Sequence, residues 1–167
     1  VLFVAGVLQT ERPEPGAIAG NGNRGRGRVR SELGFDSPVR AIYLPVLRDV
    51  LPDEYGVFDF PDPSSVNGLR HITTAPPQAL FFMNSRFVSN AAYDTAYRIF
   101  DLAKSDRDRG DLAYQLLLSR PPSAEERSGA LELMRGLDVS GLKDPEAYRW
   151  AVFIQALFSG AEFRYVL

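Results

Sequence analysis

The sequence predicts a mainly α-helical fold, a small antiparallel bundle of about five helices that follows an irregular, partly extended and proline-rich segment. Two observations carry this prediction. Prolines at positions 61, 63, 76 and 77 fix φ and remove backbone donors, so residues 60–78 are unsuited to a helix interior or a central strand. After Pro77, apolar residues recur at helical spacing, capping residues precede the runs and the connections are short.

Residues 1–38 are expected to form a separate part of the chain. Residues 1–8 have the apolar pattern of the end of a helix or of a strand, and the pattern does not decide between the two. Residues 11–37 lack periodic apolar side chains and contain ERPEPG and GNGNRGRGRVR, which predicts a flexible arm. Because the chain begins VLFVAGVLQT without an initiating Met, we expect it to be part of a longer protein.

Residues 39–167 are predicted to form the second part, extended and proline-rich over 39–77 and helical over 78–167. An edge strand is expected from Val39, because β-branched and aromatic residues surround Pro45. Residues 55–60 are expected to form a second extended piece. These two pieces would lead into the helical part.

The first two predicted helices follow the last proline pair. Pro77 suits the first turn of a short helix over residues 78–83, and Asn84 or Ser85 can cap the next helix. Apolar residues continue this second helix to Phe100, after which the charged run KSDRDRG is expected to stop it.

The last three helices are predicted from their caps. Asp111 is expected to cap the third, and Ser123 followed by Glu126 has the spacing of a capping box that opens the fourth. The last helix is predicted to start near Asp144 and the proline that follows it. On its apolar face, Trp150 is expected in the core rather than on a ligand platform. Short connections between the helices favour antiparallel neighbours.

Composition excludes several classes of site. The 167 residues contain no Cys, which rules out disulfides, thiolate zinc sites, iron–sulfur ligation and a C-x-x-C-H haem attachment in this chain. No metal site is assigned to this chain, and no cofactor is expected in it. A net charge of −2 gives no global attraction to nucleic acid or an anionic membrane. The longest apolar runs are far shorter than the roughly 20 residues that span a bilayer, so no membrane span is expected.

The proline-rich segment contains the candidate catalytic residues. His71 is the single histidine, so any histidine-based mechanism must use it. Asp59 and Asp62 lie near enough in sequence to converge with it. Two or more carboxylates could serve glycoside hydrolysis or calcium binding, if the fold brings them together.

A structural network is the alternative interpretation of the same segment. Aspartates in Asp-Pro turns bond their own backbone, and arginines pair with carboxylates. Polar residues at a helix start could hold an anion through the exposed amides, although such residues more often only cap. The members of this ligand or structural network are Arg40, Arg48, Arg70, Thr73, Thr74, Gln78 and Asn84.

Four arginines alternate with glycine or valine in the N-terminal arm, at Arg24, Arg26, Arg28 and Arg30. In an extended chain their guanidinium groups would lie on one side, roughly 6 to 7 Å apart. This spacing makes them a candidate polyanion site. Aromatic residues are not interleaved with them, which disfavours nucleic acid, and a solvated loop is the simpler interpretation.

Several motifs taken together resemble those of a known bacterial family. They are FD-x-PDP, TT-x-P-x-QAL-x-x-x-N and the terminal EFRYV. From Val39 to Leu167 the chain resembles the domain of unknown function 1553 family, which is abundant in planctomycetes. The resemblance implies a large exported parent protein, periplasmic or in the cell envelope, in which this domain follows another uncharacterised domain and often a cytochrome-c-like domain. Haem c would belong to that other part, and the resemblance brings no activity with it.

Three functions stay open at this point. The favoured hypothesis is a structural or interaction module whose proline loop docks on a neighbouring domain of the parent protein. The second is part of an enzyme that acts on extracellular polysaccharide, with Asp59, Asp62 and His71 contributed to a composite site. The third is polyanion binding through the arginine arm. Whether the chain is an enzyme therefore stays open.

Overall fold

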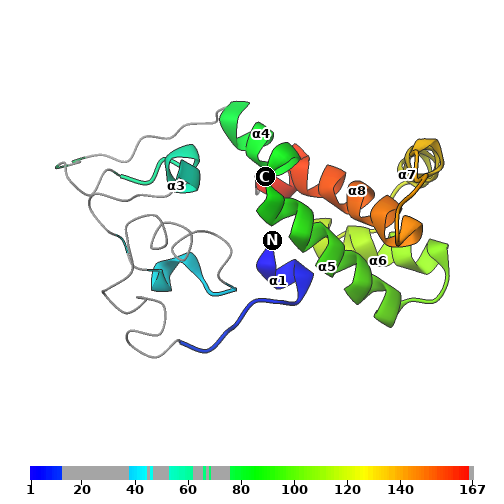
Figure 1. The fold of residues 1–167 in the computed structure, drawn as a ribbon, viewed down its shortest axis with the longest axis horizontal. Coiled ribbons are helices and arrows are strands. Elements are labelled where there is room, and N and C mark those ends of the chain that lie inside the picture. Colours follow the sequence, from blue (N-terminus) through cyan, green and yellow to red (C-terminus); the bar gives the residue numbers. More distant parts are fainter. Residues whose placement is uncertain are drawn as a thin grey trace. The chain divides into compact units, whose positions relative to one another are not determined.

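The computed structural model describes residues 1–12, 38–44, 46, 53–61, 66, 68 and 76–165 (Figure 1). The chain forms two compact units. One comprises Val1–Val7 with Phe82–Leu167, and the other comprises Leu8–Phe81. Each unit has its own packing and is described by itself.

The first unit is built on two long helices, α5 (Arg86–Leu102) and α8 (Pro145–Ser159), which pack side by side and run in opposite directions (Figure 1). The mainly helical, antiparallel prediction is confirmed. The other helices of this unit are α1 (Leu2–Ala5), the end of α4 (Pro76–Asn84), α6 (Asp106–Leu118), α7 (Ala124–Gly136) and α9 (Ala161–Arg164).

Small side chains on α5 allow α8 to approach it closely. Ala92, Ala96 and Thr95 are fully buried on one face of α5, at the spacing of an amphipathic helix. The Thr95 hydroxyl donates to the Ala91 carbonyl oxygen at 2.6 Å, so its burial leaves no unpaired donor. On α8 the largest fully buried side chain is Phe158. α5 thus contributes small buried side chains and α8 a large one, a combination that suits packing at the density of a protein core.

Two predicted helix starts are confirmed in atomic detail. The Ser123 hydroxyl accepts from the Glu126 amide at 3.1 Å, and the Glu126 carboxylate accepts from the Ser123 amide at 2.7 Å, which completes the capping box. The Asp144 carboxylate accepts from the Ala147 amide at 3.0 Å, and Pro145 follows as the first helical residue. Both starts therefore depend on neighbours within three residues along the chain.

The start predicted at Asp111 is wrong. Helix α6 begins at Asp106, and the Ser105 hydroxyl caps it by accepting from the Asp108 amide at 3.2 Å. Helix α5 does end at Leu102, as expected, but the charged run that follows is the first turn of α6. Acidic residues in a first turn are stabilised by the helix dipole, so this run opens a helix.

Helix α4 spans Pro76–Asn84, a wider range than the predicted 78–83. Its end is held by α8, because the Gln155 side-chain amide donates to the carbonyl oxygens of Phe82 at 3.3 Å and Met83 at 2.8 Å. Ser85 occupies the N-cap position of α5 with extended backbone, as predicted, although its side chain caps no described amide. The α4–α5 corner is thus fixed from α8.

The second unit has a small core of its own. Val39, Leu44 and Tyr55 are buried, with Tyr43 and Phe60 packed against them. These side chains come from two separate stretches of the chain, so the core ties the two stretches together.

Over the residues that the structure describes, neither extended piece predicted in this unit forms a strand. Val39 forms a single parallel bridge with Gln9, and a 3-10 turn, Ala41–Tyr43, follows it in place of a strand. Residues 55–60, the second predicted piece, contain the end of helix α3 (Asp53–Val57) and a turn. The aromatic residues that suggested strands serve instead to fill the small core.

Candidate functional site

Most of the residues singled out from the sequence lie outside the described part of the chain. Two candidate catalytic residues and eight arginines or threonines are in this group. Their convergence therefore stays a prediction. The residues are Asp62, His71, Arg48, Arg70, Thr73, Thr74, Arg24, Arg26, Arg28 and Arg30.

Asp59 lies in the turn that ends α3, with left-handed backbone at φ 53°. Its amide donates to the Gly56 carbonyl oxygen at 3.3 Å, and the next amide, of Phe60, donates to the Tyr55 carbonyl oxygen at 3.0 Å. The rings of Tyr55 and Phe60 meet edge to face at 5.1 Å. This is the Schellman pattern of a helix C-terminus, in which aspartate is one of the few non-glycine residues tolerated in the left-handed position.

Three other predicted residues are described. Arg40 precedes the 3-10 turn, and its carbonyl oxygen accepts from the Tyr43 amide at 2.9 Å. Gln78 and Asn84 lie six residues apart on α4, about 9 Å along the helix axis at 1.5 Å per residue. The helix therefore separates the two side chains that the sequence grouped together, rather than placing them around one ligand atom.

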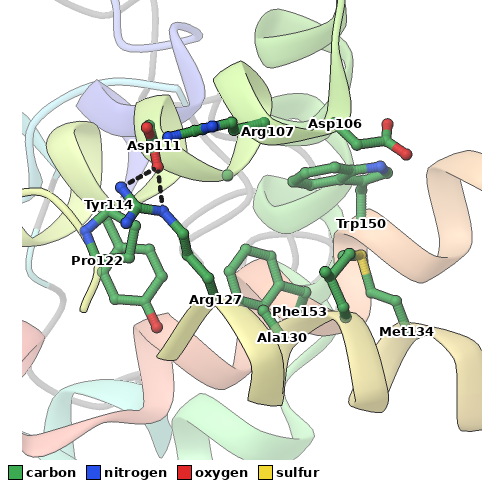
Figure 2. A pocket seen from close by; sticks show the side chains of 12 residues that line it. Asp106, Arg107, Asp111, Tyr114, Pro122, Arg127, Ala130, Met134, Trp150 and Phe153 are labelled. Carbon is green, nitrogen blue, oxygen red and sulfur yellow. Dashed lines mark hydrogen bonds and ion pairs between the residues drawn. The ribbon is translucent and has the colours of Figure 1, made fainter. Parts of the chain in front are cut away.

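A groove that the sequence did not indicate lies among α6, α7 and α8 (Figure 2). It consists of two adjoining cavities, of about 360 and 470 Å³. They share four lining residues and so form one continuous depression, which we call the Trp150 groove. The shared residues are Asp106, Leu131, Met134 and Trp150.

The first cavity of the Trp150 groove is walled mainly by aromatic and apolar side chains. The rings of Trp150 and Phe153 meet at 5.8 Å, and those of Tyr114 and Phe153 at 6.1 Å (Figure 2). Met134 is buried beside them, while Leu131 is 42% exposed at the edge. Trp150 is 3% exposed, so its predicted core position is correct, and its remaining surface faces the groove.

Each carboxylate that lines the groove is held by an arginine. Asp111 pairs with Arg127, nitrogen to oxygen 2.9 Å, as Figure 2 shows. Asp106 and Glu146 share Arg109, at 3.2 and 2.5 Å. Two arginines thus pair with three carboxylates, and Arg109 is shared between two of them.

Three further arginines line the groove without such a partner among the described residues. Arg107 lines the apolar cavity, and Arg135 and Arg149 line the charged one. Arg135 stands in the last turn of α7, where the helix dipole favours a cation. The Nε atom of Arg149 is buried and has no acceptor in the described structure. The groove is therefore apolar on one side and electropositive on the other.

An ion-pair cluster adjoins the apolar end of the groove. The Arg120 guanidinium donates to the carboxylates of Glu126 and Glu162, and lies 5.5 Å from the ring centre of Tyr114. Hydrogen bonds from Arg120 lower the pKa of Glu126 to about 2, and they lower the pKa of Glu162 as well. Burial, and then the charge of Glu126, raises the pKa of the Tyr114 phenol. Tyr114 therefore stays a neutral wall of the groove.

Sequence reasoning missed the groove because its walls come from three helices. The run SDRDRG, which supplies Asp106 and Arg107, was interpreted as a helix stop. A usable signal was present on α7, where the half-exposed Leu131 interrupts a charged surface. In the described part of the chain no group of three or more His, Asp or Glu could hold a metal ion. No described helix has the length and apolar character needed to cross a membrane.

Comparison with known proteins identifies one family. A family model described as PSD1, protein of unknown function (DUF1553), matches residues 1–134. No curated protein and no solved structure matches the chain. The matched range includes α6 and most of α7, and hence two of the three helices that wall the Trp150 groove.

Proposed function

This chain belongs to the protein family of unknown function DUF1553, and we propose that it is an interaction module of a larger exported protein, docking on a neighbouring domain of that protein. The resemblance described from its motifs supplies the context of the proposal. In that context the parent protein is periplasmic or in the cell envelope, and haem c belongs to a different domain.

The Trp150 groove carries this proposal. Its apolar cavity has a volume of about 360 Å³, in the range of sites that enclose ligands or side chains of a partner. Trp and Arg are the residues most enriched among those that dominate binding energy in protein interfaces, and this groove contains Trp150 with Arg107 and Arg149. A concave apolar hollow with a few charged side chains at its edge is the usual form of a binding site.

The chemistry of the groove favours binding over catalysis. A general acid or base needs a carboxylate that is free to exchange a proton with a substrate. Asp111 and Glu146 instead accept hydrogen bonds from arginines, Arg127 and Arg109. The helices that carry them are fixed by packing, so the groove presents a preformed surface.

Photo-cross-linking in the intact parent protein tests the proposal. Leu131 and Leu133 are both on α7 and are 42% and 40% exposed, but only Leu131 lines the groove. A photoreactive benzoylphenylalanine at position 131 should cross-link to a segment outside this chain. The same group at position 133 is the matched control and should give no such product. Equal cross-linking from both positions, or none from position 131, would contradict docking at the groove.

A further inference from the structure

The Trp150 groove has two halves of different character that share four lining side chains, Trp150 among them. Trp150 lines both cavities, the apolar one of about 360 Å³ and the charged one of about 470 Å³. An occupant that fills both must therefore present an apolar group and a polar group next to each other.

The sign of the polar group follows from the charges around the groove. Asp106 and Glu146 share the single positive charge of Arg109, and the other lining acid is held by Arg127, so these three carboxylates exceed their two arginine partners by one charge. The remaining lining charges are the guanidinium groups of Arg107, Arg135 and Arg149, none of which has an ion pair with a described residue. A net positive surface on a chain of net charge −2 selects an anionic group.

Arg149 gives the strongest indication of where this anion would sit. Its Nε atom is already removed from water and donates to no described acceptor. Because this Nε atom has almost no exposed surface, an arriving carboxylate would accept charge-assisted hydrogen bonds from the terminal guanidinium nitrogens, which have no partner among the described residues. The guanidinium fork can offer a second N–H to the same carboxylate, which defines the direction of approach.

We propose that the occupant of the groove is a peptide segment in which a large apolar side chain stands next to an acidic one. The apolar side chain packs against Trp150 and Met134, and the carboxylate accepts hydrogen bonds from Arg149, with Arg135 beside it. This inference rests on the proposed function and adds the chemistry of the partner segment. The apolar half supplies affinity, and the arginines select the acidic neighbour.

Tryptophan fluorescence provides a readout specific to the groove, because Trp150 is the only tryptophan in the chain. The probes are three capped tetrapeptides, Glu-Phe-Leu-Glu, its neutral analogue Gln-Phe-Leu-Gln and its small analogue Glu-Ala-Ala-Glu. The first should shift the Trp150 emission at concentrations at least ten-fold lower than the second. Its affinity should fall as salt rises, and the third should give no shift.

Two substitutions separate the role of charge from that of packing. Arg149→Met keeps the apolar stem and should abolish the preference for the acidic peptide. Arg86→Met, at an exposed arginine on α5 away from the groove, is the matched control and should keep the preference. Thermal unfolding of both variants establishes that each is folded. Leu131→Asp should weaken binding of both phenylalanine peptides.

The outcomes distinguish this inference from the proposed function. If the acidic and neutral peptides bind equally well, and Leu131→Asp weakens both, the inference of an acidic partner is overturned. The proposal that the groove is a docking site then still holds. An acidic preference that survives Arg149→Met would also overturn the inference. No Trp150 response to any peptide, together with no cross-link from position 131, would overturn both proposals.

Discussion

Arg120 and Glu126 form a two-pronged ion pair, with guanidinium nitrogens 2.8 and 2.7 Å from the two carboxylate oxygens. The same guanidinium donates to Glu162 at 2.6 and 2.7 Å. Because Glu126 also completes the cap of α7, this cluster joins the end of α6, the start of α7 and α9. One arginine thus holds three helix termini in place.

The first prediction concerns the dependence of stability on pH. The pKa of Glu126 falls from an ordinary value of 4.5 in the unfolded chain to about 2 in the folded one, mainly through its bond to Arg120. A depressed folded pKa contributes stability above pH 4.5, and this contribution is lost as pH falls from 4.5 toward 2. Urea unfolding of wild type and Glu126→Gln should therefore differ at pH 7, by about 1 kcal/mol, and converge near pH 2.

Glu132→Gln is the control for this experiment, since Glu132 is an exposed acid on the same helix. It should follow the wild-type pH profile. The role given to the ion pair would be contradicted if the stability difference between Glu126→Gln and wild type were the same at pH 7 and at pH 2.

The second prediction concerns the left-handed residue that ends α3. Asp59 has a φ of 53°, which glycine adopts without strain and β-branched residues strongly resist. Asp59→Gly and Asp59→Val both remove the carboxylate, so the backbone conformation predicts that Asp59→Val is less stable than Asp59→Gly by about 1 to 2 kcal/mol. Chemical denaturation of the two variants is the measurement. Equal unfolding free energies of the two variants would contradict the role given to the left-handed backbone at this position.

The third prediction concerns the end of α1. Gly6 has a φ of 78°, and a Cβ there would lie 3.1 Å from Cδ of Arg98. Arg98 in turn donates to the carbonyl oxygens of Phe3 at 3.1 Å and Val4 at 2.6 Å. Gly6→Ala should lower the unfolding free energy by about 1 kcal/mol through backbone strain. It should lower it further because the new methyl group displaces the Arg98 side chain.

A double-mutant cycle isolates the loss of stability that comes from displacing Arg98. In an Arg98→Ala background the displacement term is absent, so Gly6→Ala should cost less than it does in wild type. Strictly additive unfolding free energies for the two substitutions would mean that the new methyl group does not disturb the arginine.

The fourth prediction concerns the close contact of α5 with α8. Ala92 is fully buried, so Ala92→Leu must push apart helices that are already packed and should cost about 1 to 3 kcal/mol. Asn90→Leu on the exposed side of α5 adds comparable volume to solvent and should change stability by less than about 0.5 kcal/mol. Thermal unfolding compares the two. Equal melting temperatures would contradict the tight packing of this helix pair.

The elements that were predicted correctly are those specified by short-range interactions. The starts at Ser123 and Asp144 depend on side chains that bond amides three residues later, so the local sequence contains the whole motif. The start placed at Asp111 was wrong because several candidate caps compete in the run SDRDRG, and the apolar pattern becomes visible only after the true start at Ser105.

At residues 55–60, by contrast, long-range packing overrides the local sequence preference. Their aromatic side chains have high strand propensity, yet Tyr55 and Phe60 are needed in a core with Val39 and Leu44. A helix followed by a left-handed turn at Asp59 brings both rings to that core, and burial outweighs a propensity difference of about 1 kcal/mol or less.

The sequence by itself determined the family, the helical class and the capped starts, because each is encoded in motifs or in residues three or four positions apart. Only the tertiary structure decided that Trp150 would line a groove beside Arg107 and Arg149. Arg149 precedes Trp150 directly on α8, but Arg107 lies on α6, 43 positions before Trp150, and no periodicity along the chain relates the two helices. Packing of α6, α7 and α8 brings them together, and it also decides which arginines are paired with acids and which remain available to a partner.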